Sequence, residues 1–296
     1  MNTSTSINQY QREKKERHFE YPKANPNFIV IGGQKCATTW LFKLMVQHPQ
    51  IYIPKCKEVN FYNKTFNYGK GIEWYRNQYV GYGGERAIGE CTPNYLWTTS
   101  DPEDLTESNR TENIPALVQQ DYPNMRLIAV LREPVDRAIS AFYHHLRARY
   151  FPPNTHILDV CTKRGILSMG YYDTDLRNWF RYFPRNQFLI LFYDDVKKNP
   201  FQVIKQIFRF LEVDTNFVPQ HINSRYNIRY GSTYLYLHYY LPLVSRLLKV
   251  AFPPIIRYNW PDIKVTSSER YTLKQIYKPH VKRLENLMGK PTPWDY

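Results

Sequence analysis

A lysine that follows an apolar run is the first feature of this chain that could do chemistry. The run Phe28–Ile31 leads into Gly32 and Gly33, and Lys35 comes two residues later, ahead of a stretch of small and hydroxyl residues. A strand that ends in glycines can turn tightly, and the N–H groups of a helix that starts there face an anion, to which the lysine adds a full charge. The segment therefore predicts a loop that holds a nucleotide phosphate. The alternative is an ordinary turn between a strand and a helix, with a lysine on the surface.

A second strand, turn and helix is predicted about a hundred residues later. The apolar run Leu127–Leu131 is short and continuous, as expected for a strand covered on both faces, and Pro134 suits the first turn of a helix. Arg132 then lies at the carboxyl end of the strand, where open parallel sheets bind ligands, and Ser140 lies two turns along the helix on the same side. An arginine and a hydroxyl so placed can share one phosphate. The alternative is that Arg132 pairs with a neighbouring carboxylate and Ser140 is an ordinary helix residue.

The order of residues in the first loop separates it from the P-loop of kinases. In that loop the lysine is followed directly by a Ser or Thr that binds magnesium. Here the order is Lys-x-x-Thr-Thr, which resembles the 5'-phosphosulfate loop of sulfotransferases that use 3'-phosphoadenosine 5'-phosphosulfate. The second segment resembles the 3'-phosphate-binding element of the same family. The resemblance implies that the nucleotide is bound by Lys35, Cys36, Ala37, Thr38, Thr39, Trp40, Arg132 and Ser140.

A third segment suggests the catalytic base. Residues 57–62 read Lys-Glu-Val-Asn-Phe-Tyr and follow a short strand expected at 51–53. They resemble the Glu-x-x-Phe-Phe segment of glycan sulfotransferases, in which the glutamate takes the proton from the acceptor hydroxyl. The resemblance implies that Glu58 is the general base and that Lys35 stabilises charge on the departing 5'-phosphate. The alternative for Glu58 is a solvated carboxylate paired with Lys55 or Lys57.

The resemblance covers nearly the whole chain from residue 27, with two departures. Cys91 stands where glycan sulfotransferases often carry a lysine that can contact the acceptor or the sulfuryl group. Near the C-terminus, residues 223–230 replace a lysine-glycine-arginine loop and resemble an arginine-bearing segment of bacterial sulfotransferases. This second likeness implies that Arg225 or Arg229 completes the 3'-phosphate site and that Tyr230 stacks on adenine. A solvated basic loop is the alternative for these three residues.

Composition limits the other function classes. The formal charge of +14 is spread along the 296 residues, so a multiply anionic nucleotide explains part of it and no nucleic-acid partner is expected. The four cysteines lack metal-ligand spacing, and no metal is expected. Residues 1–26 are polar and predict a mobile N-terminal arm ahead of one sulfotransferase domain over residues 27–296. No signal-peptide core or membrane span is visible, which predicts a cytoplasmic protein without a transmembrane segment.

The segment from Tyr234 to Ile256 is rich in tyrosine and leucine and carries few charges. It predicts a helix with a break at Pro242. Three interpretations stay open for it. Ordinary packing against the core is the first, because apolar helical stripes are usually buried. The others are an aromatic wall over an acceptor pocket, and contact with a membrane surface or a second subunit.

Taken together, the sequence predicts a three-layer α/β/α fold with a central parallel sheet, the P-loop-like sulfotransferase fold. The predicted reaction moves a sulfuryl group from 3'-phosphoadenosine 5'-phosphosulfate to a hydroxyl, or less readily an amine, and leaves 3'-phosphoadenosine 5'-phosphate. A small metabolite is the first expectation for the acceptor and a saccharide the second. Two alternatives remain, an ATP-dependent small-molecule kinase and a noncatalytic binder of nucleotides or nucleic acid.

Overall fold

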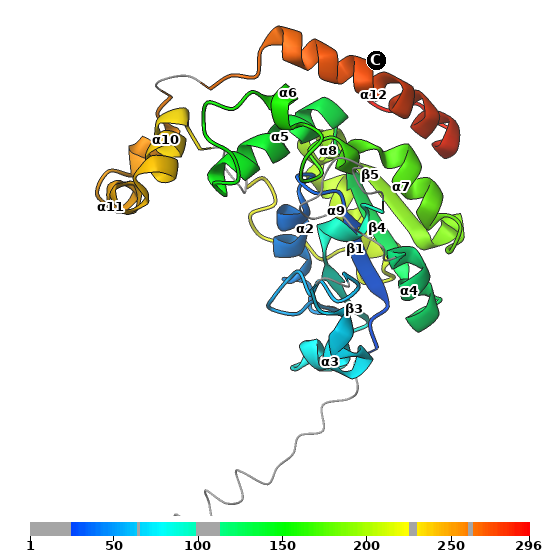
Figure 1. Ribbon diagram of the computed structural model, residues 1–296. Coiled ribbons are helices and arrows are strands. Elements are labelled where there is room, and N and C mark those ends of the chain that lie inside the picture. Colours follow the sequence, from blue (N-terminus) through cyan, green and yellow to red (C-terminus); the bar gives the residue numbers. More distant parts are fainter. Residues whose placement is uncertain (1–24, 64–65, 99–112, 225–229, 260–262) are drawn as a thin grey trace, which may run out of the picture.

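A five-stranded parallel sheet forms the centre of the molecule (Figure 1). The computed structural model describes residues 25–63, 66–98, 113–224, 230–259 and 263–296. The strand order is β2-β3-β1-β4-β5, and every neighbouring pair is parallel. The strands are β1 (Phe28–Gly32), β2 (Ile51–Tyr52), β3 (Ala87–Cys91), β4 (Arg126–Leu131) and β5 (Phe188–Phe192). The predicted α/β fold with a central parallel sheet is confirmed, as are the strands predicted from the apolar runs.

Helices cover both faces of the sheet because its inner strands are apolar on both faces. In β1, Phe28 and Val30 face one core cluster, while Ile29 and Ile31 face the other. The first cluster is covered by α2 (Thr38–Met45) and α9 (Pro200–Phe210). The second is covered by α4 (Ile114–Asp121) and α7 (Tyr172–Trp179). This alternation with period two places consecutive residues of one strand in different layers.

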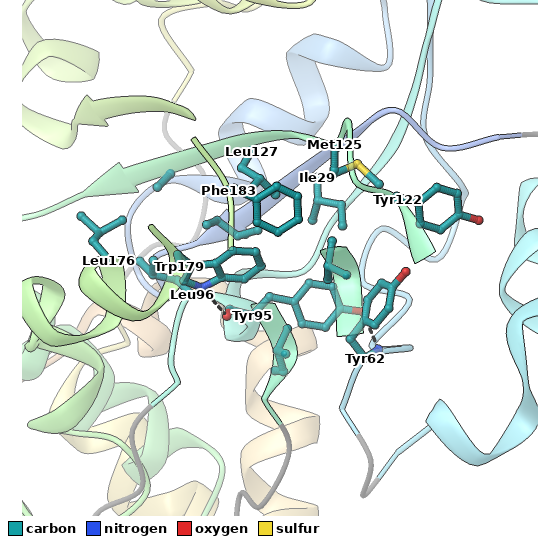
Figure 2. Close-up of a cluster of buried hydrophobic side chains, with 14 of the residues drawn as sticks. Ile29, Tyr62, Tyr95, Leu96, Tyr122, Met125, Leu127, Leu176, Trp179 and Phe183 are labelled. Atoms are coloured by element: carbon teal, nitrogen blue, oxygen red, sulfur yellow. Dashed lines mark hydrogen bonds between the residues drawn. The ribbon is translucent and has the colours of Figure 1, made fainter. Parts of the chain in front are cut away.

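The second cluster is rich in aromatic side chains, and one of them donates a hydrogen bond to the backbone. Figure 2 shows Trp179 and Phe183 beside Leu127 and Tyr95. The Trp179 indole is fully buried, and its N–H donates to the carbonyl oxygen of Tyr95 at 3.2 Å. A buried indole gains most when its polar atom has such a partner. The bond fixes the chain that follows β3 against the core.

A third group of helices lies beyond the carboxyl edge of the sheet. It consists of α5 (Pro134–Arg147), α6 (Ile157–Val160), α10 (Ser232–Tyr240), α11 (Pro242–Ala251) and α12 (Ser267–Met288). Apolar residues of α5, α10 and α12 share one cluster, and Pro134 occupies the first turn of α5 as predicted. The remaining helices are α3 (Ile72–Arg76) and α8 (Tyr193–Lys198), with short 3-10 turns η1 (Tyr68–Lys70), η2 (Asn77–Tyr79), η3 (Pro93–Tyr95), η4 (Ser168–Gly170), η5 (Arg185–Gln187) and η6 (Pro253–Arg257).

The segment rich in tyrosine and leucine breaks at Pro242 as predicted, but its two halves differ in burial. In α10, Ser232, Tyr234 and Leu235 are buried. In α11, Ser245 is the one buried residue. Ordinary core packing is therefore the wrong interpretation for α11, although it holds for the start of α10. Residues 1–24 of the predicted N-terminal arm lie outside the described residues.

The chain changes direction across the sheet between β1 and β4. After β1 it crosses toward β2 and β3, and after β4 it crosses toward β5, although β1 and β4 are neighbours. Two neighbouring strands whose connections leave in opposite directions open a crevice at their carboxyl ends, and ligands of α/β sheets bind there. The loops that bear Lys35 and Arg132 begin at these two strand ends.

Gly32 marks the point where β1 turns into the first of these loops. Its φ is 152°, and a Cβ at this position would lie 2.7 Å from the Leu96 Cβ and 2.7 Å from the Pro93 carbonyl oxygen. Replacing Gly32 by alanine should lower the free energy of unfolding by about 2–4 kcal/mol, through steric overlap and backbone strain. Equilibrium unfolding in urea measures this change.

Gly69 supplies the matched control, because no atom lies within 4 Å of the position that its Cβ would take. Gly69→Ala should change the free energy of unfolding by no more than about 0.5 kcal/mol. If Gly32→Ala proved as stable as the Gly69→Ala protein, the close approach described here would be wrong.

Candidate functional site

A pocket of about 380 Å³ lies at the crevice between β1 and β4. It is lined by Lys35, Arg132, Asp136, Ile139, Ser140, Tyr143, His144, Arg147, Tyr193, Tyr230 and Arg270. Four residues predicted from the sequence, Lys35, Arg132, Ser140 and Tyr230, thus meet around one cavity. They come from three separate stretches of the chain. Two further predicted residues, Arg225 and Arg229, lie outside the described residues.

The loop between β1 and α2 has the backbone shape of an anion-binding turn. Lys35 and Ala37 adopt left-handed conformations, with φ of 65° and 69°. Ala37 is the N-cap of α2 and has no side chain that could accept from the first turn. Left-handed conformations of residues other than glycine occur where the surrounding structure or a ligand requires them. An anion bound at this loop would cap α2 in place of a side chain.

The side chains that follow Lys35 hold the loop in place and do not line the pocket. The Cys36 thiol is buried beside the Gln34 carbonyl oxygen at 3.4 Å, and burial raises its pKa. The Trp40 indole donates to the carbonyl oxygen of Ile222 at 2.8 Å, and Thr38 is buried. The backbone N–H groups at this helix start could still meet an anionic ligand.

Lys35 shows how strongly the site is biased toward anions. Its pKa is lowered to about 8, first by burial and then by the positive charges of Arg147 and Arg132. Three cationic side chains thus converge on one partly desolvated cavity. Such an arrangement destabilises the empty site and favours a multiply charged anion.

Arg132 is held in place by its neighbours, and one of its buried N–H donors has no partner among them. Its Nη1 donates to the carbonyl oxygen of Lys35 at 3.4 Å, and its guanidinium lies 5.0 Å from the centre of the Tyr193 ring. The Tyr172 hydroxyl donates to the Arg132 carbonyl oxygen at 3.0 Å and fixes the strand end. The Nε of Arg132 is buried and has no hydrogen-bond partner within the described ranges. A buried N–H without a partner requires an acceptor from outside the chain, and a phosphate oxygen fits it.

One face of α5 supplies the rest of the pocket wall. Ser140, His144 and Arg147 are four and three residues apart, so they share one side of the helix. The Arg147 guanidinium lies 5.2 Å from the centre of the Tyr230 ring and within 3.4 Å of the His144 Nδ1. Burial, together with Lys35 and Arg147, lowers the pKa of His144 to about 4. Arg147 escaped the sequence prediction, although its helical spacing from Ser140 was a usable signal.

Among the described residues, Asp136 is the one carboxylate that lines the pocket, and it is already engaged. Its Oδ1 accepts from the Arg270 Nη2 at 2.8 Å. Its charge is therefore shared with a cation that also lines the cavity. The described lining keeps a positive balance, because Lys35, Arg132 and Arg147 lie there with Asp136 as the one acidic residue.

Glu58 lies on the same edge of the sheet but does not line the pocket. Its carboxylate accepts from the Lys57 Nζ at 2.6 Å, and its side chain is 38% exposed. This ion pair is the alternative that the sequence left open for Glu58. Lys57 also joins the loop to β3, because its carbonyl oxygen accepts from the Cys91 N–H at 3.1 Å.

Glu90, on β3, fixes the loop that carries Glu58 by hydrogen bonds. Its Oε2 accepts from the Val59 N–H at 3.1 Å and from the Thr92 hydroxyl at 2.5 Å, and its Oε1 accepts from the Tyr75 hydroxyl at 2.9 Å. Burial raises the pKa of Glu90 to about 7, and these hydrogen bonds oppose the shift. Cys91, the first departure from the resemblance noted in the sequence, is buried next to it.

The described residues hold no group of three or more His, Cys, Asp and Glu side chains that could bind a metal ion. None of the helices in the described part of the chain combines the length and the hydropathy that a membrane crossing requires.

Residues 25–228 match the family described as "Sulfotransferase domain". The human "Heparan sulfate glucosamine 3-O-sulfotransferase 5" is 28% identical over 221 residues, which cover 70% of this chain and 58% of that protein. The mouse "Bifunctional heparan sulfate N-deacetylase/N-sulfotransferase 4" is 28% identical over 214 residues, which cover 65% of this chain and 23% of that protein. The chain thus spans just over half the length of the first relative and about a quarter of the second.

A solved structure agrees with the fold. The sulfotransferase from Alicyclobacillus acidocaldarius superposes with a TM-score of 0.66 at 22% sequence identity. The match covers 91% of this chain and 98% of that protein. At this identity the likeness establishes the architecture of the sheet and its helices.

Lys35 provides a test of the electrostatics. Its pKa of about 8 in the folded protein lies below the ordinary value of 10.5, so the buried charge opposes folding at pH 7. Lys35→Met should raise the free energy of unfolding of the ligand-free protein by about 1–3 kcal/mol at pH 7. The gain should shrink between pH 8 and 10.5, because the folded protein then releases this proton before the unfolded chain does.

Lys43, exposed on α2, gives the matched control. Lys43→Met should alter the free energy of unfolding by no more than about 0.5 kcal/mol at any of these pH values. Denaturant unfolding across the pH range measures both variants. A Lys35→Met protein that is less stable than the wild type at pH 7 would contradict the crowding of charge described here.

Proposed function

Because this chain belongs to the sulfotransferase family, we propose that it transfers a sulfuryl group from 3'-phosphoadenosine 5'-phosphosulfate to a hydroxyl or amine of a saccharide. The observation that carries the proposal is the meeting of Lys35, Arg132 and Ser140 around one cationic pocket. The nucleotide has two phosphate groups, and the pocket has two places that can bind an anion, the Lys35 loop after β1 and Arg132 with Ser140 after β4.

Each end of the donor has a place in this arrangement. Arg132 and Ser140 hold the 3'-phosphate, and the buried Nε of Arg132 gains the acceptor that it lacks. Lys35 and the start of α2 hold the 5'-phosphate. Tyr230 lies against Tyr234 with ring centres 4.9 Å apart and lines the pocket, so it is placed to contact the adenine.

The reaction is a displacement at sulfur. The acceptor oxygen or nitrogen forms a bond to sulfur, and the bond between sulfur and the 5'-phosphate oxygen breaks. The acceptor proton passes to the Glu58 carboxylate, and the electron pair of the broken bond stays on the phosphate of 3'-phosphoadenosine 5'-phosphate. Lys35 and the N–H groups of α2 stabilise the negative charge that develops there. Positioning and electrostatics supply most of the acceleration, as in phosphoryl transfer.

Glu58 fits the role of base in two respects. Its loop is fixed to β3 through Val59 and Lys57, so the carboxylate is held at the carboxyl edge where the acceptor must approach. The Lys57 ammonium lies 2.6 Å from this carboxylate and helps to hold it in place. An ionised carboxylate can accept a proton as the acceptor becomes acidic in the transition state.

A saccharide is the acceptor that the relatives' names favour. The two relatives compared above are named for sulfation of heparan sulfate, whereas the sequence alone favoured a small metabolite. We therefore place saccharides first and small metabolites second. The location in the cytoplasm remains a prediction.

The kinase alternative requires a carboxylate that can bind magnesium, and the acidic residue just after β5 is already engaged by other side chains. This residue, Asp194 at the carboxyl edge of the sheet, accepts from the Lys197 Nζ at 2.9 Å and from the Trp294 indole N–H at 3.1 Å. A kinase would also need a hydroxyl after the lysine to bind magnesium, and Thr38, the first hydroxyl residue after Lys35, is buried. These contacts favour a site that binds phosphates through cations and N–H groups.

The donor site can be tested by calorimetric titration with 3'-phosphoadenosine 5'-phosphate. Arg132→Ala should weaken binding by about 100-fold, because two or more charge-assisted hydrogen bonds are lost. Arg126→Ala is the matched control, since Arg126 begins the same strand and pairs with Glu212 at 2.6 Å, away from the pocket. It should bind within about twofold of the wild type. Tighter binding of ATP with magnesium, or equal binding by Arg132→Ala, would overturn the donor assignment.

The base can be tested with Glu58→Gln. This variant should lower kcat by about 100- to 10,000-fold, while its affinity for 3'-phosphoadenosine 5'-phosphate stays within about twofold of the wild type. The assay follows transfer of labelled sulfate to unsulfated oligosaccharides and to small hydroxyl compounds. Glu73→Gln is the control, because Glu73 is a comparable ion-paired glutamate, 2.6 Å from Arg76 and remote from the pocket. Undiminished turnover by Glu58→Gln would reject Glu58 as the base and direct attention to His144.

A further inference from the structure

The outer side of α11 is an exposed apolar surface that the proposed reaction does not use. Helices α10 and α11 project from the body of the molecule next to α5 (Figure 1). Leu243, Leu247 and Val250 are 72%, 71% and 83% exposed, and Val244 is exposed beside them. We call these four residues the α11 face. Clustered apolar exposure of this kind marks a surface that meets another partner.

The α11 face is one continuous stripe of an amphipathic helix. Residues 243, 247 and 250 are four and three positions apart, which places them on one side of the helix. The opposite side holds Ser245, which is buried and donates to the Pro242 carbonyl oxygen at 2.8 Å. Exposed Tyr240, Leu241 and Phe252 at the ends of the helix extend the apolar surface.

Positive charge borders this surface. Arg246, Lys249 and Arg257 are exposed on α11 and η6, and residues 230–259 contain no aspartate or glutamate. A helix with an apolar side and a basic border has the pattern of helices that lie in the interface of a membrane with anionic headgroups.

We propose that the α11 face docks on the surface of an anionic lipid membrane. The apolar side chains enter the boundary between headgroups and acyl chains, and the three basic side chains contact lipid phosphates. The helix has ten residues, about half of what a membrane crossing needs, so it lies along the surface.

Charge decides between a membrane and a second copy of the chain. Two α11 faces brought together would place Arg246, Lys249 and Arg257 of each copy near those of the other, without a carboxylate on either unit between residues 230 and 259. Like charges in one interface disfavour association. An anionic surface, in contrast, is complementary to both the apolar and the basic parts.

The docking surface adjoins the pocket. The Lys249 Nζ donates to the Tyr230 hydroxyl at 3.3 Å, and Tyr230 lines the pocket. A membrane bound at α11 would therefore hold the pocket close to the lipid headgroups. This docking does not depend on which group the pocket transfers.

Vesicle co-sedimentation tests the proposal with the full chain. The wild type should sediment with phosphatidylcholine vesicles that contain phosphatidylglycerol and much less with pure phosphatidylcholine. Leu243→Ser combined with Leu247→Ser should lower the partition coefficient at least about tenfold, through the loss of apolar burial. Arg246→Glu combined with Arg257→Glu should have a similar effect, through repulsion from the lipid phosphates.

Val80→Ser combined with Val218→Ser is the matched control, because both valines are exposed but lie far from α11 in the sequence and on other elements. This control should sediment within about twofold of the wild type. The wild type and the three double variants should unfold at the same denaturant concentration, because every substitution lies at an exposed position. This measurement verifies that all four proteins are folded. The proposal would be overturned if the wild type sedimented equally with and without phosphatidylglycerol. It would also be overturned if both α11 double variants sedimented as well as the wild type. A lipid-free dimer that Leu243→Ser with Leu247→Ser dissociates, detected by light scattering, would replace it with self-association.

Discussion

The convergence of half-buried positive charge at the carboxyl ends of β1 and β4 is the constraint on which the site depends. Lys35, Arg132 and Arg147 line one cavity, and Asp136, the carboxylate found in the described part of its wall, is already paired with Arg270. The depressed pKa of Lys35 reflects first its burial and then the positive charges of Arg147 and Arg132. Folding tolerates this partial burial of charge because the strands beneath are covered on both faces by apolar side chains. A dianionic ligand would remove the repulsion, so affinity for the ligand and stability of the empty protein are opposed at this site.

The loop that bears Glu58, the proposed base, is positioned by a buried acid. Glu90 collects hydrogen bonds from a backbone N–H and from tyrosine and threonine hydroxyls, and through Val59 it fixes the loop of Glu58. A satisfied buried network of this kind is rigid, because breaking any member leaves a buried polar group without a partner. The cationic pocket thus relies on the turn after β1, whereas the proposed base relies on the contacts of β3. Both strands are neighbours in the sheet, which places the two elements on one edge.

The sequence predicted the elements that carry local signals, and it missed those that arise from tertiary contact. The strands under Lys35 and Arg132 are short apolar runs, and Pro134 marks the start of α5, so these parts were readable. The i+7 spacing of Arg147 from Ser140 was also readable on a helix. The role of Glu90 was not, since its partners Tyr75 and Val59 come from distant segments. The exposure of α11 was not readable either, because an apolar stripe has the same pattern whether or not another element covers it.

The two cationic regions of the molecule are continuous with each other. Arg147 lowers the pKa of Lys35 inside the pocket and also lies against the Tyr230 ring. Lys249 of α11 donates to the hydroxyl of the same tyrosine. Positive potential therefore extends from the phosphate loop across α5 to the border of the α11 face. A nucleotide in the pocket and an anionic surface at α11 would neutralise neighbouring parts of one charge distribution, so at low ionic strength each should reduce the electrostatic attraction available to the other.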